Sequence, residues 1–203
     1  MSLKWKMGGY YKHMPHINLQ SDLYGITSVL DFRPESAAPL CELTQMLLRG
    51  ESSLTEAERE LIASHVSSLN ECVFCSSAHT AATCLLPGGN ETGIQPMQTS
   101  LDSLHINDKM KSLLRIAAKV QQSGRNVTQE DVELAKMNGA TDREIHDTVL
   151  IAALFCMYNR YVDGLATSTP ADADFYQTLG KRITTRGYMM PKDGYHATDY
   201  KNQ

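Results

Sequence analysis

The sequence has little of what marks a membrane protein or a nucleic-acid-binding protein. No apolar run approaches the roughly 20 residues that a membrane-spanning helix needs, and the first residues lead into Gly8 and Gly9 rather than into the apolar core of a signal peptide. The net charge of -4 and the pI of about 6.0 provide no basic field for nucleic acid or for an anionic membrane surface. We therefore expect a cytoplasmic protein with no nucleic-acid and no membrane partner.

Signals for strands and for disulfides are also scarce. No segment shows a sustained alternation of apolar and polar residues. The five cysteines are an odd number, in a chain of 203 residues that is long enough to bury a sizeable core without a disulfide framework. In a reducing compartment, a close pair of cysteines indicates redox or metal chemistry rather than a structural cross-link.

Helical signals are frequent in the middle of the chain. Leu40, Leu43 and Leu47 recur every three or four residues, as the buried positions of a helix do. Capping boxes, in which a Thr precedes a Glu by three residues, mark two further helix starts, at Thr55 and Thr141. The sequence predicts an all-α fold of six or more helices, near residues 36–49, 55–69, 72–86, 107–122, 128–138 and 141–164.

Both ends of the chain differ from this helical middle. Residues 1–35 contain several glycines and prolines and show weak periodicity, which indicates an irregular arm. Residues 166–203 are rich in Thr, Asp, Tyr and Gly, and we expect at most one short helix there, near residues 174–182. We predict a single domain, residues 1–203, with a helical core of about 36–165 and two arms, the second lying across a neighbouring copy in an oligomer.

The most informative stretch is a Cys-x-x-Cys followed by a histidine, formed by Cys72, Cys75 and His79. No Gly or Pro interrupts it and alanines follow it, so we expect a helix that begins at Cys72 after a break at Asn70 and Glu71. The spacings of three and four residues place both sulfurs and the imidazole on one face of that helix. The amides at a helix N-terminus carry partial positive charge, which would stabilise a thiolate there and lower its pKa.

Three kinds of site are compatible with these residues. Free cysteines often fill hydrophobic core, and this interpretation suits the isolated Cys41, Cys84 and Cys156. Metal binding would use the cysteine pair and His79, with Cys84 or Glu60 as the fourth ligand, although the second pair of ligands typical of structural zinc sites is not evident.

The third kind of site is a redox site. A thiolate attacks one oxygen of a hydroperoxide, an alcohol leaves, and the cysteine becomes a sulfenic acid. The neighbouring cysteine then condenses with it and releases water, and an external dithiol reopens the disulfide by exchange. One helical turn separates Cys72 from Cys75, so the disulfide needs little backbone movement. His79 follows Cys75 by four residues and could accept its proton.

A glutamate upstream completes a recognisable spacing. Eleven residues separate Glu60 from Cys72, and Cys75 and His79 follow. This set resembles the motif of the AhpD-like family, specifically its peroxidase-related branch within the carboxymuconolactone decarboxylase superfamily. From the residues alone Glu60 is a solvated carboxylate, because it lies roughly 160° around its helix from the buried Ile62. Only the resemblance turns Glu60 inward, next to the cysteines.

The resemblance extends over residues 36–165, because the long apolar helix is followed by the branch's characteristic ending, Asn159-Arg160 and then Asp163-Gly164. It implies an AhpD-like helical bundle that forms a homo-oligomer, either a dimer, a trimer or a hexamer. It also implies alkylhydroperoxidase activity without haem, flavin or metal. The implied partners are a small hydroperoxide substrate and a dithiol reductant protein.

The resemblance also assigns roles to the residues. Cys75 would be the peroxidatic thiol and Cys72 the resolving thiol, while Glu60 would act as the base through His79. One position departs from the best-studied AhpD proteins, which have a second histidine directly before the second cysteine, where this chain has Phe74. With Phe74 the proton relay has one proton-carrying side chain fewer, and the ring would instead form an apolar wall.

These observations favour an enzyme, a thiol-dependent peroxidase or disulfide reductase that acts on small organic hydroperoxides. Two other functions stay open. One is a lactone decarboxylase like the other half of the superfamily, a chemistry that needs no cysteine pair. The other is a non-enzymatic helical scaffold that is sensitive to redox conditions, in which a disulfide forms but turns over slowly.

Overall fold

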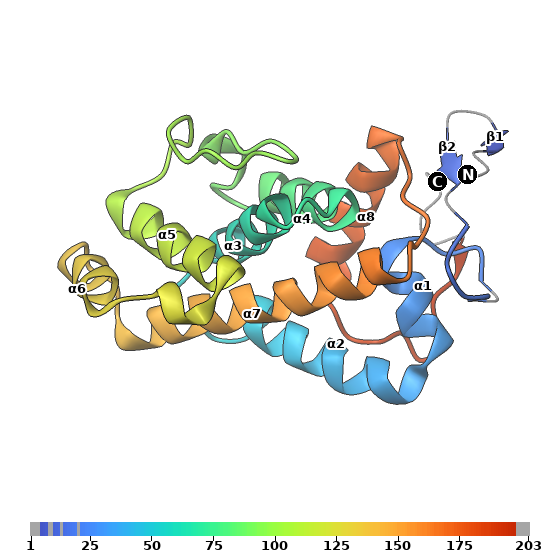
Figure 1. Ribbon diagram of the computed structural model, residues 1–203, viewed down its shortest axis with the longest axis horizontal. Coiled ribbons are helices and arrows are strands. Elements are labelled where there is room, and N and C mark those ends of the chain that lie inside the picture. The colour runs from blue at the N-terminus through green and yellow to red at the C-terminus, as the bar shows by residue number, and fades with distance from the viewer. Residues whose placement is uncertain (1–4, 8–9, 13, 20, 198–203) are drawn as a thin grey trace.

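The structure, a computed structural model, describes residues 5–7, 10–12, 14–19 and 21–197. This part of the chain forms a short antiparallel hairpin and eight α-helices, which confirms the all-α prediction (Figure 1). The elements are β1 (Trp5–Met7), β2 (Tyr10–Lys12), α1 (Gly25–Phe32), α2 (Pro34–Arg49), α3 (Glu56–Leu69), α4 (Val73–Leu85), the 3-10 helix η1 (Asn90–Thr92), α5 (Asp108–Gln122), the 3-10 helix η2 (Gly124–Asn126), α6 (Gln129–Met137), α7 (Asp142–Gly164) and α8 (Ala173–Arg186). In the hairpin Trp5 pairs with Lys12 and Met7 with Tyr10.

The two predicted capping boxes start α3 and α7. The Thr55 hydroxyl accepts from the Glu58 amide at 3.2 Å, and the Glu58 carboxylate accepts from the Thr55 amide at 2.8 Å. Thr141 and Glu144 repeat this exchange at 3.2 Å and 2.7 Å. Each box satisfies two amides that would otherwise lack a partner in the first turn, so both helix starts are confirmed.

The long helix α7 runs along the length of the bundle (Figure 1). Helices α3 and α5 pack against it, α6 packs against α5, and α2 contacts α3. Helix α4 packs against α3 and also against α8. The main hydrophobic core lies between α2, α3, α5 and α7, around residues such as Leu48, Ile62, Leu113, Ile151 and Phe155.

A second hydrophobic cluster forms around α4 and draws on both ends of the chain. It combines Phe74 and Cys75 with Leu30 of α1 and with Phe175 and Leu179 of α8. The prediction of an irregular N-terminal arm is therefore wrong for α1, and α8 is longer than the short helix expected near residues 174–182. Eight residues are too few to show a helical period clearly, and the apolar partner of α1 lies far along the chain.

No helix among the described residues combines the length and the apolar character that crossing a membrane requires.

Candidate active site

A tight turn between α3 and α4 places the two helices side by side. Asn70 caps α3, and Glu71 takes a left-handed conformation with φ 59°. The amides of Glu71 and Cys72 donate back to carbonyl groups of α3, at 3.0 Å each. A residue with a Cβ pays roughly 1 kcal/mol or more for this conformation, which the surrounding contacts must offset. The predicted break at Asn70 and Glu71 is confirmed, and it brings the cysteines next to α3.

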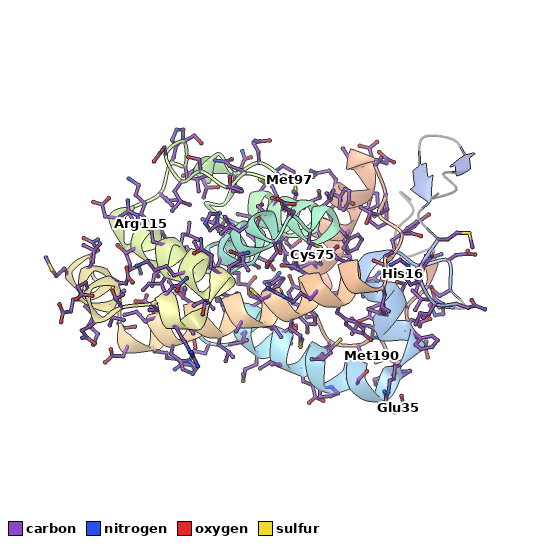
Figure 2. The ribbon with its side chains drawn as sticks, in the orientation of Figure 1. His16, Glu35, Cys75, Met97, Arg115 and Met190 are labelled. Carbon is purple, nitrogen blue, oxygen red and sulfur yellow. The ribbon has the colours of Figure 1, made fainter. Side chains whose placement is uncertain are left out.

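The predicted cysteine and histidine face exists and is buried. Cys72 is the N-cap of α4, with Cys75 in the first turn and His79 in the next. Their exposed fractions are 0%, 3% and 8%, and Cys75 lies in the interior of the molecule (Figure 2). All five cysteines are free thiols.

The two thiols of the pair are not equivalent. A hydrogen bond between Cys72 and Cys75, together with burial, raises the pKa of Cys72 well above its ordinary value. The lowering expected from the helix N-terminus is therefore outweighed at Cys72, because a buried thiolate loses hydration and a neighbouring sulfur competes for the charge. Cys72 keeps its proton at neutral pH.

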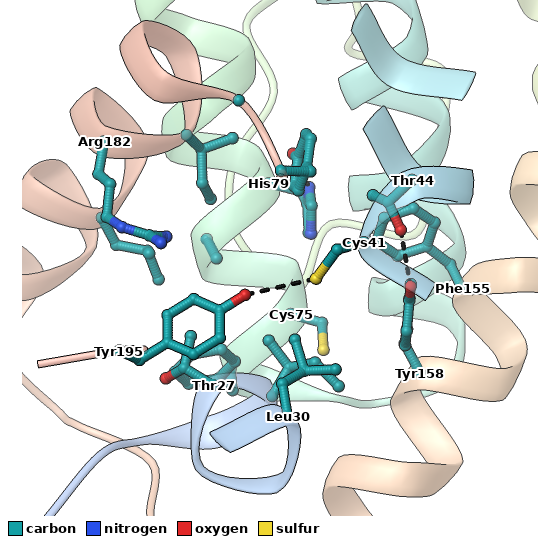
Figure 3. A pocket seen from close by; sticks show the side chains of 17 residues that line it. Thr27, Leu30, Cys41, Thr44, Cys75, His79, Phe155, Tyr158, Arg182 and Tyr195 are labelled. Atoms are coloured by element: carbon teal, nitrogen blue, oxygen red, sulfur yellow. Dashed lines mark hydrogen bonds between the residues drawn. The ribbon is translucent and has the colours of Figure 1, made fainter. Parts of the chain in front are cut away.

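A cavity of about 70 Å³ lies in front of Cys75. This is several times the roughly 15 Å³ that one water molecule requires. Side chains from α1, α2, α4, α7, α8 and the segment after α8 line the cavity, and its walls are mainly apolar. Figure 3 shows the thiol of Cys75 and the ring of His79 turned toward it. Cys72 is not among the lining residues, so of the pair only Cys75 can meet a molecule in the cavity.

Glu60 lies inside the protein, fully buried on α3. Its Oε2 accepts from His79 Nδ1 at 2.6 Å, and its Oε1 accepts from Arg49 Nη2 and from the Tyr188 hydroxyl at 2.5 Å each. Burial raises the pKa of Glu60, but His79, Arg49 and Tyr188 together hold that pKa below its ordinary value. The carboxylate is therefore ionised although it is buried.

The expectation for Glu60 from the residues alone, a solvated side chain, is wrong, and the position implied by the resemblance is right. Most residues of α3 are buried, because α2, α4, α5 and α7 all pack against it. On a helix surrounded in this way, the angle from a known buried residue such as Ile62 does not identify an exposed face.

The contact with Glu60 sets the tautomer of His79. An ionised carboxylate can only accept, so Nδ1 of His79 carries the hydrogen of this contact, and in the neutral ring the lone pair is on Nε2. The ring edge of Phe155 packs against the imidazole, with ring centres 4.5 Å apart and planes at 84°. His79 lines the same cavity as Cys75, so the basic nitrogen belongs to the side of the ring that does not face Glu60.

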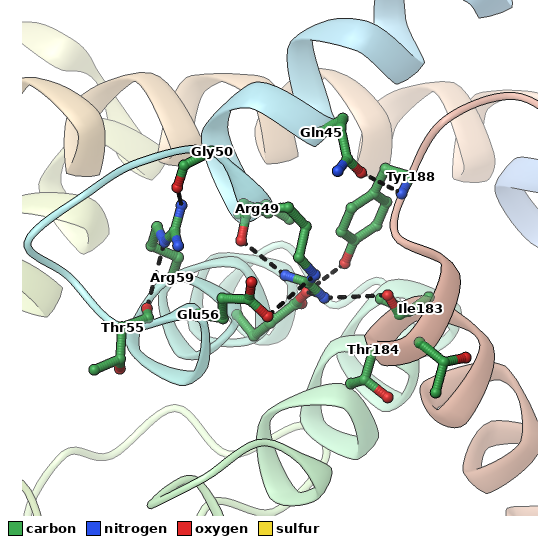
Figure 4. Close-up of polar contacts among 12 residues, drawn as sticks. Gln45, Arg49, Gly50, Thr55, Glu56, Arg59, Ile183, Thr184 and Tyr188 are labelled. Atoms are coloured by element: carbon green, nitrogen blue, oxygen red, sulfur yellow. Dashed lines mark hydrogen bonds and ion pairs between the residues drawn. The ribbon is translucent and has the colours of Figure 1, made fainter.

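Arg49 and Tyr188 are site residues that the sequence analysis missed (Figure 4). Arg49 is the last residue of α2, its side chain is 6% exposed, and its Nε also lies 3.6 Å from Glu56. Tyr188 follows the glycine that ends α8, in the region expected to be an arm. No local motif marks either residue, because each belongs to the site through contacts with residues that are not its neighbours in the sequence.

Comparisons with known proteins agree with this architecture. The sequence model of the carboxymuconolactone decarboxylase family matches residues 34–84, which include all four predicted site residues. The solved structure of an uncharacterised peroxidase-related protein from Silicibacter sp. TM1040 matches with a TM-score of 0.64 and 28% identity, over 72% of this chain and 76% of that one. The chain therefore has an AhpD-like fold, and residues 34–84 are similar to the carboxymuconolactone decarboxylase family.

A second solved structure has the same fold. It is described as an alkylhydroperoxidase AhpD core, an uncharacterised peroxidase-related protein from Ralstonia eutropha JMP134. It matches with a TM-score of 0.64 and 24% identity, over 75% of this chain and 78% of that one. No curated protein matches the sequence significantly.

Phe74 is an aromatic anchor of the site. Its ring lies 6.3 Å from the ring of Phe175 and 6.0 Å from that of Tyr176, both on α8. A Cβ atom at Gly25 would collide with the same ring, so α1 also approaches it closely. Phe74 also lines the cavity, as the prediction of an apolar wall requires. Phe74 stands where the best-studied AhpD proteins have a second histidine. Its ring therefore anchors α1 and α8 next to the cysteines.

We expect Phe74→Ala to lower the free energy of unfolding by about 3 to 5 kcal/mol, because the cavity left between α1, α4 and α8 cannot close completely. Urea denaturation followed by circular dichroism measures this loss. The matched control is Val73→Ala, one residue earlier and 48% exposed, for which we expect a change within about 0.5 kcal/mol. A loss below about 1 kcal/mol for Phe74→Ala would show that the ring does not anchor α8.

The family ending on α7 supports the turn before the cysteines. Asn159 donates from Nδ2 to the Ser67 hydroxyl at 3.1 Å, and its Oδ1 accepts from Asn70 at 2.8 Å. Burial raises the pKa of Asp163, and a hydrogen bond with Cys72 partly opposes that rise. Asn159 and Asp163, which the resemblance identified only by their spacing, therefore contact the turn between α3 and α4 and the cysteine that follows it.

The structure does not place either candidate fourth metal ligand, Glu60 or Cys84, as a free ligand beside the cysteine pair and His79. Both oxygens of Glu60 already accept hydrogen bonds, and Cys84 packs, half-buried, against the main core. The described residues hold no group of three or more His, Cys, Asp or Glu side chains arranged for a metal ion. Cys41, assigned to core by its sequence, lines the cavity, with its sulfur 3.4 Å from the Tyr195 hydroxyl.

Proposed function

We propose that this protein is a thiol peroxidase that reduces small organic hydroperoxides through Cys75 and Cys72. The observation that carries the proposal is the common cavity of Cys75 and His79, combined with the Glu60 contact that leaves a basic nitrogen on His79. The peroxidase-related and AhpD descriptions of proteins with the same fold support the same class of chemistry.

In the first step His79 Nε2 takes the proton of the Cys75 thiol, directly or through one water. The thiolate attacks one peroxide oxygen, a sulfur-oxygen bond forms and the oxygen-oxygen bond breaks. The departing alkoxide takes the proton from His79 and leaves as an alcohol. Cys75 is then a sulfenic acid, and Glu60 has stabilised the transient imidazolium without changing its own charge.

In the second step Cys72 attacks the sulfur of the Cys75 sulfenic acid. A sulfur-sulfur bond forms, the sulfur-oxygen bond breaks, and hydroxide leaves with the Cys72 proton as water. The two thiols are already hydrogen-bonded, so the approach needs little movement. A dithiol reductant protein then supplies two electrons and two protons by thiol-disulfide exchange and restores both thiols.

Titration of the free thiols with an organic hydroperoxide tests the proposal. We expect two thiols to be lost for each equivalent of peroxide, and mass spectrometry to locate them at Cys72 and Cys75. The half-buried Cys84 and Cys156 are internal controls that should stay reduced. If no hydroperoxide is consumed with any dithiol reductant, the proposal fails. A disulfide that forms but is not turned over would favour the scaffold function.

A further inference from the structure

The residue after α8 is held against α2 by its backbone. Gly187 ends α8 with φ 67°, in the left-handed region that favours glycine. A Cβ there would collide with the Gln45 side chain, and the next amide, that of Tyr188, donates to Gln45 Oε1 at 2.7 Å. The place of the Tyr188 ring is therefore set by main-chain contacts, which a change of its side chain leaves intact.

The ring of Tyr188 packs near both Arg49 and His79. The Arg49 guanidinium carbon is 5.0 Å from the ring centre. The imidazole of His79 is nearly parallel to the ring, with planes at 14° and centres 6.2 Å apart. A phenylalanine could make both contacts, so they account for the aromatic ring and leave the hydroxyl unexplained.

The hydroxyl contacts the two members of the acid-base couple. It donates to Glu60 Oε1 at 2.5 Å and lies 3.4 Å from His79 Nδ1. Arg49 donates to the same Glu60 oxygen, while the other oxygen accepts from His79. Tyr188 is one of three donors to this buried carboxylate, and it comes from a segment outside the family match at residues 34–84.

We propose that Tyr188 is a positioning residue for the acid-base couple: by donating to Glu60 it weakens the hold of the carboxylate on His79 and so sets how readily His79 releases a proton. The proposal rests on the proposed peroxidase function for its kinetic consequence, while its structural consequence stands on the hydrogen bonds alone.

The sign of the effect follows from where the charge goes. Glu60 stabilises the protonated form of His79, and each additional donor to Glu60 reduces the negative charge available for this. Removing the hydroxyl leaves more negative charge facing His79, so the imidazolium becomes more stable relative to the neutral ring. Activity requires His79 without that proton, so the acid limb of the activity moves to higher pH.

Several other groups share this environment and stay in place when the hydroxyl is removed. Arg49 still pairs with Glu60, and Glu56 still lies beside Arg49. The other titratable or charged side chains near the couple include Arg59, whose charge interacts with Glu60, and the cavity-lining Cys41, Cys75, Tyr158, Arg182 and Tyr195.

The kinetic test is the pH dependence of kcat/KM for Tyr188→Phe. We expect the pH at which kcat/KM falls on the acid side to rise by about half to one unit. Below that pH the variant's kcat/KM should be roughly three- to tenfold lower than that of the wild type, and at higher pH the loss should be smaller. The matched control is Tyr158→Phe, which removes another hydroxyl from the same cavity, one that contacts Thr44 at 2.6 Å and the Leu40 carbonyl at 3.0 Å. In this control the limb should not move.

A second readout needs no turnover. NMR titration of the His79 ring, assigned with a His79→Gln variant, should show the same upward shift in Tyr188→Phe and none in Tyr158→Phe. The shift by NMR without peroxidase activity in wild type would uphold the positioning role and reject the peroxidase. An unchanged His79 titration, or a uniform loss of rate at all pH values, would overturn the inference whatever the activity.

Discussion

Replacing Cys75 with serine is expected to abolish hydroperoxide consumption, with a loss of roughly 10³-fold or more, because a serine hydroxyl does not ionise under conditions where a thiol does. Cys75 is the thiol of the pair that lines the cavity beside His79. Cys72→Ser should behave differently, since in the proposed mechanism Cys72 acts only after the peroxide bond has broken. That variant should reduce one equivalent of peroxide per chain and then stop, with a sulfenic acid on Cys75.

Peroxide consumption coupled to a dithiol measures the first effect, and trapping with dimedone followed by mass spectrometry measures the second. The control is Cys84→Ser, which alters a half-buried thiol that does not line the cavity. If Cys72→Ser were inactive and Cys75→Ser retained turnover, the two roles would be reversed. Activity that survives the double Cys72→Ser, Cys75→Ser change would revive a lactone decarboxylase.

Arg49→Met is expected to lower the free energy of unfolding by about 3 to 5 kcal/mol, because it removes the cation from a fully buried carboxylate. The Arg49 side chain is 6% exposed, and its Nη2 also lies 3.4 Å from the Ile183 carbonyl. Tyr188 and His79 would still donate to Glu60, but neither supplies a permanent positive charge. Urea denaturation at neutral pH, with the m-value checked for constancy, measures the loss.

Two further variants define the cause of this loss. The double variant Arg49→Met, Glu60→Gln should recover part of the stability, because no unpaired charge is then buried, yet it should not recover peroxidase activity. Lys136→Met is the control for a surface ion pair, since Lys136 lies 2.6 Å from Asp142 and both side chains are about half exposed or more. We expect a change of about 0.5 kcal/mol or less for it. Equal losses for Arg49→Met and Lys136→Met would contradict a special role for burial.

Local sequence alone determined the helices in the middle of the chain and half of the candidate site, but not α1 or the full length of α8. The starts of α3 and α7 follow from capping boxes, whose two partners lie three residues apart. The common face of Cys72, Cys75 and His79 follows from the pitch of a helix. These features were predictable because each depends on residues within one or two turns of each other.

Tertiary structure decided the remainder. Whether Glu60 faces water depends on the helices that surround α3, and its contact with Tyr188 joins residues 128 positions apart. Phe74 became an anchor only because α1 and α8, at opposite ends of the chain, meet over it. Such contacts leave no period or motif in either partner, because neither segment's local pattern depends on which distant surface it will cover.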